Sequence, residues 1–342
     1  MNIIVPMAGI GSRLRPHTLT IPKPLTLVAG KPIVQRLVED IVKVLNLPDG
    51  KAGQKIEEIA FVIGPIFPAN TEKKLLDIAK NLGAKGIVTV QHEALGTAHA
   101  IQCAKQSLNG PCVVAFADTL FKADFTLDAE ADGAIWVKQV ENPSAYGVIK
   151  LKDGVITDFV EKPDEFISDL AIIGIYYFKN GEILRDEIQY LLDNNIKEKG
   201  EFQLTNALEN MKQKGLKFVP GQVDEWMDCG NKEITVETNG RVLQFVYQDG
   251  QNLVSDTVLL ENSEIIQPCY IGENVKLINT KVGPNVSLGT NCVVENSTIS
   301  NSLIQTNTTI KNATFDNAMI GNNVVYNGDF KSISIGDYSQ LI

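Results

Sequence analysis

The amino-acid sequence predicts an α/β domain, with a mostly parallel mixed sheet and helices on both faces, followed by a parallel β-helix. Three observations support this fold class. The chain has 342 residues, and at about 150 residues per domain this length accommodates two domains. Short apolar strands alternate with amphipathic helical segments up to residue 117, and aliphatic residues recur at a step near six toward the end of the chain.

Four short apolar runs read as buried strands, and a helical pattern separates each run from the next. The runs cover residues 2–5, 59–63, 87–90 and 113–117, and the helical patterns cover residues 32–45, 71–82 and 97–108. The first helix shows the spacing clearly, with apolar residues at Ile33, Leu37, Ile41 and Val44. Strands that alternate with helices form right-handed βαβ units, so we expect a Rossmann-like sheet.

A different pattern follows between residues 147 and 214. Two apolar runs, 147–151 and 155–159, flank Asp153-Gly154, a dipeptide typical of a tight hairpin turn. A further apolar strand is expected at residues 172–178, and another helix within residues 200–214. We expect these segments to form a flap over the carboxyl ends of the parallel strands, where ligands bind in open α/β sheets.

The composition changes near residue 250. Residues 251–342 contain four lysines, no arginine and no histidine, and asparagine is frequent. Apolar residues recur there in steps of five or six, at Ile271, Leu277, Val282, Leu288, Val294, Ile299, Ile304, Ile310, Phe315 and Ile320. A helix would step by three and four, and a hairpin strand by two. A step near six is typical of a parallel β-helix, in which one side chain per flat face points into a narrow core.

A helical segment joins the two parts of the chain. It covers residues 231–247, and the six-residue period begins after it. The predicted domains are therefore residues 1–246 and residues 247–342.

Composition and charge exclude several classes of protein. With 31 Lys and Arg against 41 Asp and Glu, the net charge is −10, which disfavours a duplex nucleic-acid binder. No apolar run reaches the roughly 18 residues of a membrane-spanning helix, and the first residues lack the basic region of a signal peptide. The five cysteines show no CxxC spacing and the chain has three histidines, so we expect neither disulfides nor a zinc site, and a cytoplasmic protein.

The segment after the first strand carries the first chemical signal. It reads GIGSRLRP over residues 9–16, without the third glycine of a dinucleotide-binding fingerprint and without the Gly-Lys-Ser/Thr of a P-loop. Its glycines still allow backbone amides to approach a phosphate, and Arg13 offers a bidentate donor that stays charged. Lys23 follows in Pro-Lys-Pro-Leu, where the next proline holds it in an extended conformation.

These features belong to an ordered set of short motifs. The set comprises Gly9-x-Gly11-x-Arg13, residues 22–25, residues 30–32, residues 91–100, residues 116–118, Tyr146-Gly147, Glu161-Lys162-Pro163, Gly174, residues 200–202 and residues 226–230. In this order the motifs resemble the signature of the sugar-1-phosphate nucleotidylyltransferases, and in particular of the long glucose-1-phosphate thymidylyltransferases. Many members of that family carry a C-terminal left-handed β-helix, so the resemblance implies the same handedness here.

The resemblance implies a reaction in which a sugar 1-phosphate attacks the α-phosphorus of a nucleoside triphosphate and pyrophosphate leaves. No covalent enzyme intermediate is expected, so the protein positions the substrates and neutralises charge. Arg13 and Lys23 would bind the triphosphate, and Lys162 would bind the sugar phosphate. Asp118 and Asp228 would hold Mg²⁺, which prefers carboxylate oxygens. These five residues are the predicted catalytic set.

The resemblance also implies which residues contact each substrate. The nucleotide is expected to contact Ala8, Gly9, Gly11, Ser12, Arg13, Lys23, Gln91, Gly96 and Thr97. The sugar phosphate is expected to contact Gly147, Glu161, Lys162, Gly174 and Trp226. Taken singly, each residue has a structural alternative, such as a turn for Asp118 or a solvated hairpin lysine for Lys162. As an ordered set they favour function.

Several alternatives stay open for the activity. The preferred substrates are dTTP and glucose 1-phosphate, and UTP with glucose 1-phosphate or GTP with mannose 1-phosphate are alternatives. A non-catalytic regulatory subunit of the same fold would often lose one of Arg13, Lys23, Asp118 and Asp228, and all four are present. An acyl-transferring β-helix typically uses a histidine, which residues 251–342 lack. We expect the β-helix to mediate self-association into a homo-oligomer, with neither nucleic acid nor a membrane as partner.

Overall fold

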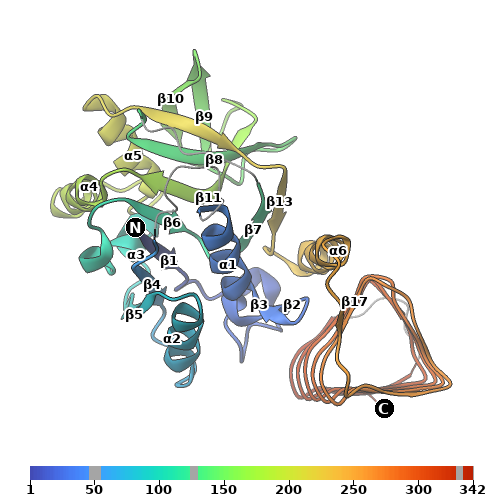
Figure 1. Ribbon diagram of the computed structural model, residues 1–342. Helices are drawn as coiled ribbons and strands as arrows, with labels where there is room; N and C mark the ends of the chain where they lie inside the picture. The colour runs from blue at the N-terminus through green and yellow to red at the C-terminus, as the bar shows by residue number, and fades with distance from the viewer. Residues whose placement is uncertain (46–54, 124–129, 329–333, 342) are drawn as a thin grey trace. The chain divides into compact units, whose positions relative to one another are not determined.

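The computed structural model describes residues 1–45, 55–123, 130–328 and 334–341. The chain divides into two units (Figure 1). The first unit consists of Met1–Gly9 and Leu37–Trp226, and the second of Ile10–Arg36 and Met227–Ile342. The segment after the first strand therefore folds with the C-terminal part of the chain.

The four predicted parallel strands form one half of the main sheet in the first unit. They are β1 (Asn2–Pro6), β4 (Glu58–Ile63), β5 (Lys85–Val90) and β6 (Cys112–Ala115), in the spatial order β5-β4-β1-β6. The connecting helices are α1 (Ile33–Leu45), α2 (Thr71–Asn81) and α3 (Thr97–Gln102). The chain runs from β1 to β4 and β5 in one direction and then returns to β6 on the other side of β1. Right-handed crossovers therefore place α1 and α2 on one face and α3 on the opposite face.

Five further strands extend the same sheet, so the expectation of a separate flap was wrong. They are β8 (Gly133–Gln139), β9 (Val148–Lys152), β10 (Val155–Val160), β11 (Leu170–Phe178) and β12 (Phe218–Gln222). The strand β11 pairs antiparallel with both β6 and β8. The predicted hairpin turn is confirmed, because Asp153 and Gly154 both have positive φ between the paired residues Lys152 and Val155.

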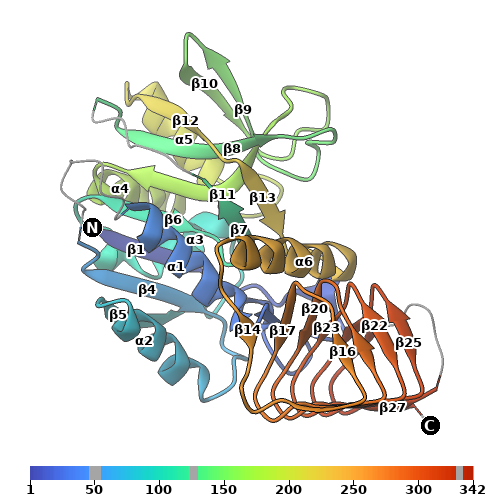
Figure 2. The ribbon, with the colours of Figure 1, turned by 45° about the vertical axis from the view of Figure 1, so that its right-hand side comes forward.

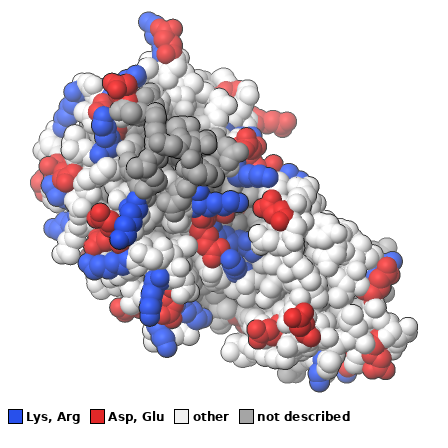
Figure 3. Space-filling model, viewed as in Figure 1, with Lys and Arg blue, Asp and Glu red and all other residues white. Residues whose placement is uncertain are grey.

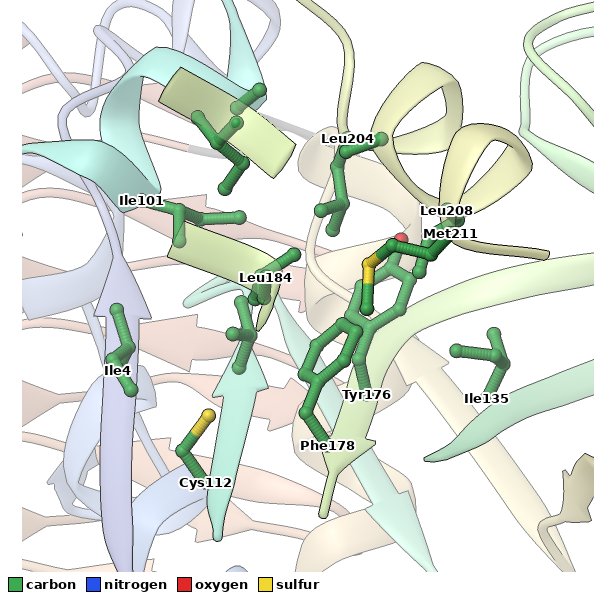
Figure 4. Packing of buried hydrophobic residues seen from close by; sticks show 14 of the residues in the cluster. Ile4, Ile101, Cys112, Ile135, Tyr176, Phe178, Leu184, Leu204, Leu208 and Met211 are labelled. Carbon is green, nitrogen blue, oxygen red and sulfur yellow. The ribbon is translucent and has the colours of Figure 1, made fainter. Parts of the chain in front are cut away.

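The core on one face of this sheet holds three helices in place. They are α3, α4 (Gly181–Asp193) and α5 (Leu204–Gln213), and a short 3-10 turn (Lys105–Ser107) replaces the predicted end of the first of these. Figure 4 shows Ile4 of β1 and Phe178 of β11 in the same cluster as Leu184 and Leu208 of the covering helices. Burying each such side chain stabilises the fold by about 1.5–3 kcal/mol.

Two short strands complete the first unit near the end of the sheet. The strand β7 (Thr119–Lys122) follows β6, and β13 (Glu225–Asp228) begins in the first unit and ends in the second. The backbone N–H of Asp224, just before β13, donates to the carbonyl of Lys122 at 2.9 Å. This bond places the start of β13 beside the end of β7.

The C-terminal part of the second unit is a β-helix of short parallel strands. Three parallel sheets run in the orders β14-β17-β20-β23-β26-β28, β15-β18-β21-β24-β27-β29 and β16-β19-β22-β25. The strands are β14 (Leu253–Val254), β15 (Leu259–Glu261), β16 (Glu264–Ile265), β17 (Cys269–Ile271), β18 (Lys276–Ile278), β19 (Lys281–Val282), β20 (Val286–Leu288), β21 (Val293–Glu295), β22 (Thr298–Ser300), β23 (Leu303–Ile304), β24 (Thr309–Lys311), β25 (Thr314–Asp316), β26 (Met319–Ile320), β27 (Val325–Asn327), β28 (Ser334–Ile335) and β29 (Gln340–Leu341). All ten residues predicted to point inward are at most 1% exposed, which confirms the six-residue period. Figure 1 shows the triangular coils end-on, and Figure 2 shows them stacked.

The frequent asparagines occupy the corners of the coils. Eleven of them, from Asn262 to Asn323, have a positive φ, a conformation that asparagine tolerates better than most residues. Asn291 is typical, with φ 61. Its Oδ1 accepts a hydrogen bond from Asn274 Nδ2 at 3.2 Å, and its Nδ2 donates to Asn307 Oδ1 at 3.0 Å. The amides therefore form ladders that link successive coils.

The predicted linking helix is confirmed as α6 (Lys232–Gln248). Asn231 caps it, with Oδ1 accepting from the backbone N–H of Ile234 at 3.0 Å. Figure 2 shows α6 along the coils of the β-helix, and Ser287 Oγ donates to Asn239 Oδ1 at 2.7 Å between them. In the described ranges of the chain, no helix is long and apolar enough to cross a membrane.

The first strand pair of the second unit lies in the segment before α1. It comprises β2 (Leu27–Val28) and β3 (Lys31–Pro32), which pair antiparallel. Two short 3-10 turns, Ser12–Leu14 and Lys23–Leu25, precede this pair.

The surface in Figure 3 shows basic and acidic side chains interspersed on the face in view, in keeping with the acidic composition.

Candidate functional site

The carboxyl ends of the parallel strands meet at one edge of the sheet in the first unit. Chain order reverses at β1, and ligands of open α/β sheets bind at such a switch point. Ala8 and Gly9 follow β1, while Asp118 follows β6, its neighbour in the sheet. The backbone N–H of Ala117 donates to the carbonyl of Pro6 at 3.4 Å. The predicted nucleotide residues Ala8 and Gly9 therefore lie next to the loop of Asp118.

Three of the residues expected to contact the nucleotide come together after β5. Gln91 is 8% exposed, and its Nε2 donates to the carbonyl of Gly96 at 3.2 Å and lies 3.1 Å from His99 Nδ1. Gly96 has φ 115, and a Cβ there would lie 2.5 Å from the carbonyl oxygen of Phe202. The hydroxyl of Thr97 accepts from the backbone N–H of Leu204 at 2.9 Å. The start of α5 therefore fixes the conformation of this loop, and only glycine fits at position 96.

Glu161 and Gly147 form the centre of a second group, with Gly147 just before β9 and Glu161 just after β10. Thr205 Oγ1 donates to Glu161 Oε2 at 3.1 Å, and Lys162 Nζ lies 3.4 Å from Glu161 Oε1. A Cβ on Gly147 would lie 3.2 Å from Glu161 Oε2, so a larger residue would crowd the carboxylate. Thr205 is a site neighbour that the sequence analysis missed, because its partner lies 44 positions away along the chain.

Lys162 has an unusual backbone in this group. Its φ is 39, its backbone N–H donates to the carbonyl of Tyr146 at 3.2 Å, and its side chain is 50% exposed. A lysine in the left-handed region is strained, and such strain is often found at functional sites. The ring of Tyr146 in turn meets that of Trp226 edge-on, with centroids 5.0 Å apart.

Gly174 joins the second group to the loop of Asp118. Its φ is 87, and its carbonyl accepts from the backbone N–H of Phe116 at 2.9 Å. Thr119 Oγ1 also donates to the carbonyl of Ile173 at 2.7 Å. The predicted sugar residue Gly174 therefore lies on β11, the strand that pairs with β6.

The remaining predicted residues belong to the second unit. Gly11 has φ 62, and its carbonyl accepts from Thr18 Oγ1 at 2.8 Å. A Cβ on Gly11 would lie 2.9 Å from the Cβ of Lys23, which is 6% exposed. Ser12 and Arg13 are exposed in the 3-10 turn between them. The structure therefore brings Gly11 and Lys23 together and leaves Ser12 and Arg13 at the surface of this unit.

Asp228 ends β13 and begins the link to α6. Its carbonyl accepts from Thr238 Oγ1 at 2.7 Å. A Cβ on Gly230 would lie 2.5 Å from Asp228 Oδ2, so the glycine keeps the space beside this carboxylate open.

The donor chemistry suits magnesium. Among the residues that the structure describes, no group of three or more His, Cys, Asp or Glu side chains is arranged to hold a metal ion. Asp118 and Asp228 offer hard carboxylate oxygens, and Mg²⁺ in phosphate-transfer sites uses one or two carboxylates together with phosphate oxygens. Each carboxylate is therefore a ligand of the kind that this ion prefers.

The buried cysteines Cys112 and Cys269 are poor candidates for a nucleophile. None of the five forms a disulfide. Burial raises the pKa of the Cys112 thiol to about 12 and that of the Cys269 thiol to about 11. These thiols stay protonated at neutral pH, and a protonated thiol is a poor nucleophile.

Comparison with known proteins decides the family. Residues 3–244 match the model of the nucleotidyl transferase family. The chain belongs to this family. The resemblance noted in the sequence is thereby confirmed.

Related sequences extend the similarity into the C-terminal part. The low-salt glycan biosynthesis nucleotidyltransferase Agl11 of Haloferax volcanii is 29% identical over 326 residues, which cover 89% of this chain and 87% of that protein. A glucose-1-phosphate thymidylyltransferase of Streptomyces antibioticus is 26% identical over 369 residues, covering 100% of this chain and 99% of that protein. The bifunctional protein GlmU of Methanocaldococcus jannaschii is 30% identical over 272 residues. That match covers 78% of this chain and 60% of GlmU, so the chain spans less than two thirds of this relative.

Solved structures of similar fold cover 69% to 71% of the chain. The nucleoside-diphosphate-sugar pyrophosphorylase of Vibrio cholerae RC9 has a TM-score of 0.58 and 21% identity, covering 69% of this chain and 99% of that one. A UDP-glucose pyrophosphorylase complexed with UDP-glucose has a TM-score of 0.56 and 25% identity, covering 71% of this chain and 98% of that one. The mixed sheet predicted from the sequence is thus the fold of known sugar-nucleotide enzymes.

Proposed function

We propose that this chain transfers the nucleotidyl group of a nucleoside triphosphate to a sugar 1-phosphate and releases pyrophosphate. The order of the motif residues along one edge of the sheet carries the proposal. The loop of Gln91 follows β5, Ala8 and Gly9 follow β1, and Asp118 follows β6. Gly174 comes next on β11, and Glu161 directly follows the end of β10. This order suits a product in which a diphosphate joins a base to a sugar.

The reaction is a single displacement at the α-phosphorus. A phosphate oxygen of the sugar 1-phosphate forms the new bond, and the bond to the bridging oxygen breaks as pyrophosphate leaves with its electrons. Lys162 would bind the attacking phosphate, and Glu161, held by Thr205, would accept hydrogen bonds from sugar hydroxyls. Arg13 and Lys23, with the backbone amides around Gly9, Gly11 and Ser12, would neutralise the triphosphate. Tyr146 and Trp226 would border the sugar.

Magnesium is the cofactor that we propose, with Asp118 and Asp228 as its ligands. When bound, this ion supplies positive charge to the reacting phosphates. The carboxylates would hold it, and Gly230 leaves the approach to Asp228 open.

For the substrates, we propose dTTP and glucose 1-phosphate. The support is the full-length similarity to a glucose-1-phosphate thymidylyltransferase. UTP with glucose 1-phosphate is a second candidate, because the similar structure of a UDP-glucose pyrophosphorylase carries UDP-glucose. Gln91 and Gly96 can pair with the polar edge of either pyrimidine, so the contacts in the base loop do not separate the two.

A substrate panel tests these assignments. Purified protein is incubated with Mg²⁺ and each of dTTP, UTP and GTP against glucose 1-phosphate and mannose 1-phosphate, and pyrophosphate release is measured. We expect the highest kcat/KM with dTTP and glucose 1-phosphate. A preference for UTP would replace the nucleotide assignment, and no release with any pair would favour the non-catalytic regulatory subunit.

We also propose that the two parts of the chain have different roles. Residues 1–246 would carry the activity, and residues 247–342 would mediate self-association in the cytoplasm. Exposed ends of a stacked β-helix favour contact with another copy. Sedimentation at micromolar concentration would show an oligomer, and a monomer would contradict this role.

A further inference from the structure

One outer face of the β-helix is buried under the segment that carries Gly11, Arg13 and Lys23. Segment and β-helix belong to the same unit. The face is that of the sheet β14-β17-β20-β23-β26-β28. Its outward residues Leu303 and Met319 are at most 1% exposed, whereas Lys276 and Lys281 on the other two sheets are exposed. The outer face of this sheet is therefore not exposed to solvent, because the segment packs against it.

Contacts run across successive strands of this face. Leu14 is buried in a cluster with Leu303, Met319 and Val236. His17 Nε2 lies 2.7 Å from Ser334 Oγ on the last strand of the face. The short stretch that follows Arg13, from Leu14 to His17, is thus fixed to the β-helix at both of its ends.

The second half of the segment is held in the same way. The backbone N–H of Ala29 donates to Asn239 Oδ1 at 2.9 Å. A Cβ on Gly30 would overlap the ring of Tyr270, so the chain passes directly over this ring. Gln305 Nε2 donates to the carbonyl of Leu27 at 3.1 Å. The segment is held from Leu14 to Gly30.

Gln305 breaks the pattern of the coils. In this sheet, the residue after the inward aliphatic side chain is Ser255 in the first coil, and then Gly272, Gly289, Gln305, Gly321 and Gly336 in the following coils. The next coil explains the glycines, since a Cβ on Gly272 would lie 2.8 Å from the backbone nitrogen of Thr290 and one on Gly289 would lie 2.7 Å from that of Thr306. The side chain of Gln305 instead reaches the segment, and this glutamine is only 5% exposed. A residue that departs from the local rule in this way needs a compensating contact.

We propose that Gln305 is a positioning residue for the triphosphate, which it serves by holding the carbonyl of Leu27. This inference rests on the function proposed above. Thr26 alone separates Leu27 from the 3-10 turn of Lys23, and the backbone N–H of Thr26 donates to the carbonyl of Lys23 at 3.0 Å. A loop that is fixed before the ligand arrives binds it at a lower cost in conformational entropy. The β-helix therefore sets the geometry of the phosphate-binding segment.

Two substitutions separate this role from simple packing. Gln305→Gly installs the residue of the neighbouring coils and removes the hydrogen bond. Gln305→Glu keeps the size of the side chain and replaces its donor with an acceptor, which faces the Leu27 carbonyl. The control is Thr309→Gly, which weakens the same coil on β24 of a different sheet.

Two measurements are made on the full-length chain. Amide hydrogen exchange follows residues 14–30, with residues 59–63 of β4 as the internal reference. Steady-state kinetics give KM for dTTP and for glucose 1-phosphate. Loss of one buried hydrogen bond is expected to speed exchange in the segment and raise KM for dTTP by about two- to tenfold each. The reference peptide, KM for glucose 1-phosphate and the Thr309→Gly control should stay near wild type.

Each outcome decides the proposal. If both Gln305 variants show the expected changes, Gln305 positions the segment for the triphosphate. If Gln305→Glu behaves as wild type, or exchange quickens with no change in KM for dTTP, the positioning role is overturned. If the wild-type protein releases no pyrophosphate with any substrate pair, the proposed function fails, and the exchange rates alone decide whether Gln305 holds the segment.

Discussion

Lys162 combines a left-handed backbone with a cationic side chain beside Glu161. The two features can be tested separately, because glycine relieves the backbone strain and alanine does not. We expect Lys162→Gly to unfold at a higher temperature than Lys162→Ala, since a non-glycine residue in this region costs about 1–2 kcal/mol. Both variants should raise KM for the sugar 1-phosphate by roughly 10- to 150-fold, the loss of one charge-assisted hydrogen bond of ~1.5–3 kcal/mol.

The control for this pair is Lys150→Ala, which removes an exposed lysine of β9 in the same hairpin. It should leave both KM values unchanged. A sugar-phosphate KM of wild-type size in Lys162→Gly would remove Lys162 from the site.

Arg13 tests the phosphate role of the segment after β1. Its guanidinium can bridge two phosphate oxygens, which a lysine ammonium cannot reproduce. We expect Arg13→Lys to lower kcat more than it raises KM for the triphosphate, because the charge on the departing pyrophosphate grows in the transition state. Arg15→Lys, an exposed neighbour, is the matched control. If Arg13→Lys shows wild-type kcat and kcat/KM, this arginine is a surface residue, where an ion pair adds only ~0–1 kcal/mol.

At this scale the sequence showed the residues that belong to contiguous motifs. Gln91, Gly96 and Thr97 lie within ten positions, and the structure joins them in one loop. Thr205 and Gln305 were missed because each acts through a partner far away in the chain. Glutamine and threonine also carry no charge that would mark them in a sequence.

The asparagine ladders are the element-scale feature that holds the β-helix corners. Asn291 contributes both its positive φ and two ladder hydrogen bonds. We expect Asn291→Gly to lower the free energy of unfolding by about 1 kcal/mol through the lost bonds. Asn291→Ala should cost about 1 kcal/mol more, since alanine must also adopt the left-handed conformation. Urea unfolding gives the order of stability of the three proteins. An alanine variant at least as stable as the glycine variant would contradict the proposed role of the left-handed conformation at the corner.

His17 gives the contact between the segment and β28 a pH dependence. Burial lowers its pKa to about 4, with Asp337 opposing this effect and Lys232 adding to it. The folded protein therefore favours the neutral ring, whose contribution is complete above pH ~6.5 and is lost as the pH falls toward 4. His17→Gln cannot be protonated and should remove up to about 3 kcal/mol of this dependence.

Unfolding measured at several pH values checks the role of His17. Between pH 6.5 and 4 the free energy of unfolding of the wild type should fall more steeply than that of His17→Gln. Parallel curves for the two proteins would show that this histidine is not buried in the neutral form.

The elements with a regular period could be predicted, and those without one could not. Helix α1 and the ten inward residues of the β-helix follow their spacing closely. The strands β8 and β12 and the helix α4 were not foreseen. The flap was wrong because an apolar run such as Ile172–Phe178 does not reveal its partner, and β11 pairs with β6, which lies some 60 positions earlier.

On the scale of the whole molecule, the second unit is formed by two stretches of chain that are far apart in the sequence. Ile10–Arg36 leaves the first unit after β1 and folds with Met227–Ile342 before the chain returns. Composition can divide a chain only into contiguous domains. It therefore could not predict that residues 10–36 fold with the C-terminal unit. The contacts of Leu14 with Leu303 and of Leu27 with Gln305 connect residues more than 270 positions apart, which local patterns do not report.

The central claim is that the two aspartates and the motif residues along the sheet edge form a nucleotidyl transfer site. Its most direct test is the initial rate of pyrophosphate release from dTTP with glucose 1-phosphate and Mg²⁺, for the wild type, Asp118→Asn and Asp228→Asn. The account predicts release that requires both substrates, and a loss of at least about 100-fold in each variant, with circular dichroism and thermal unfolding unchanged. Near-normal magnesium-dependent rates in either variant, or no release by the wild type with any substrate pair, would contradict it.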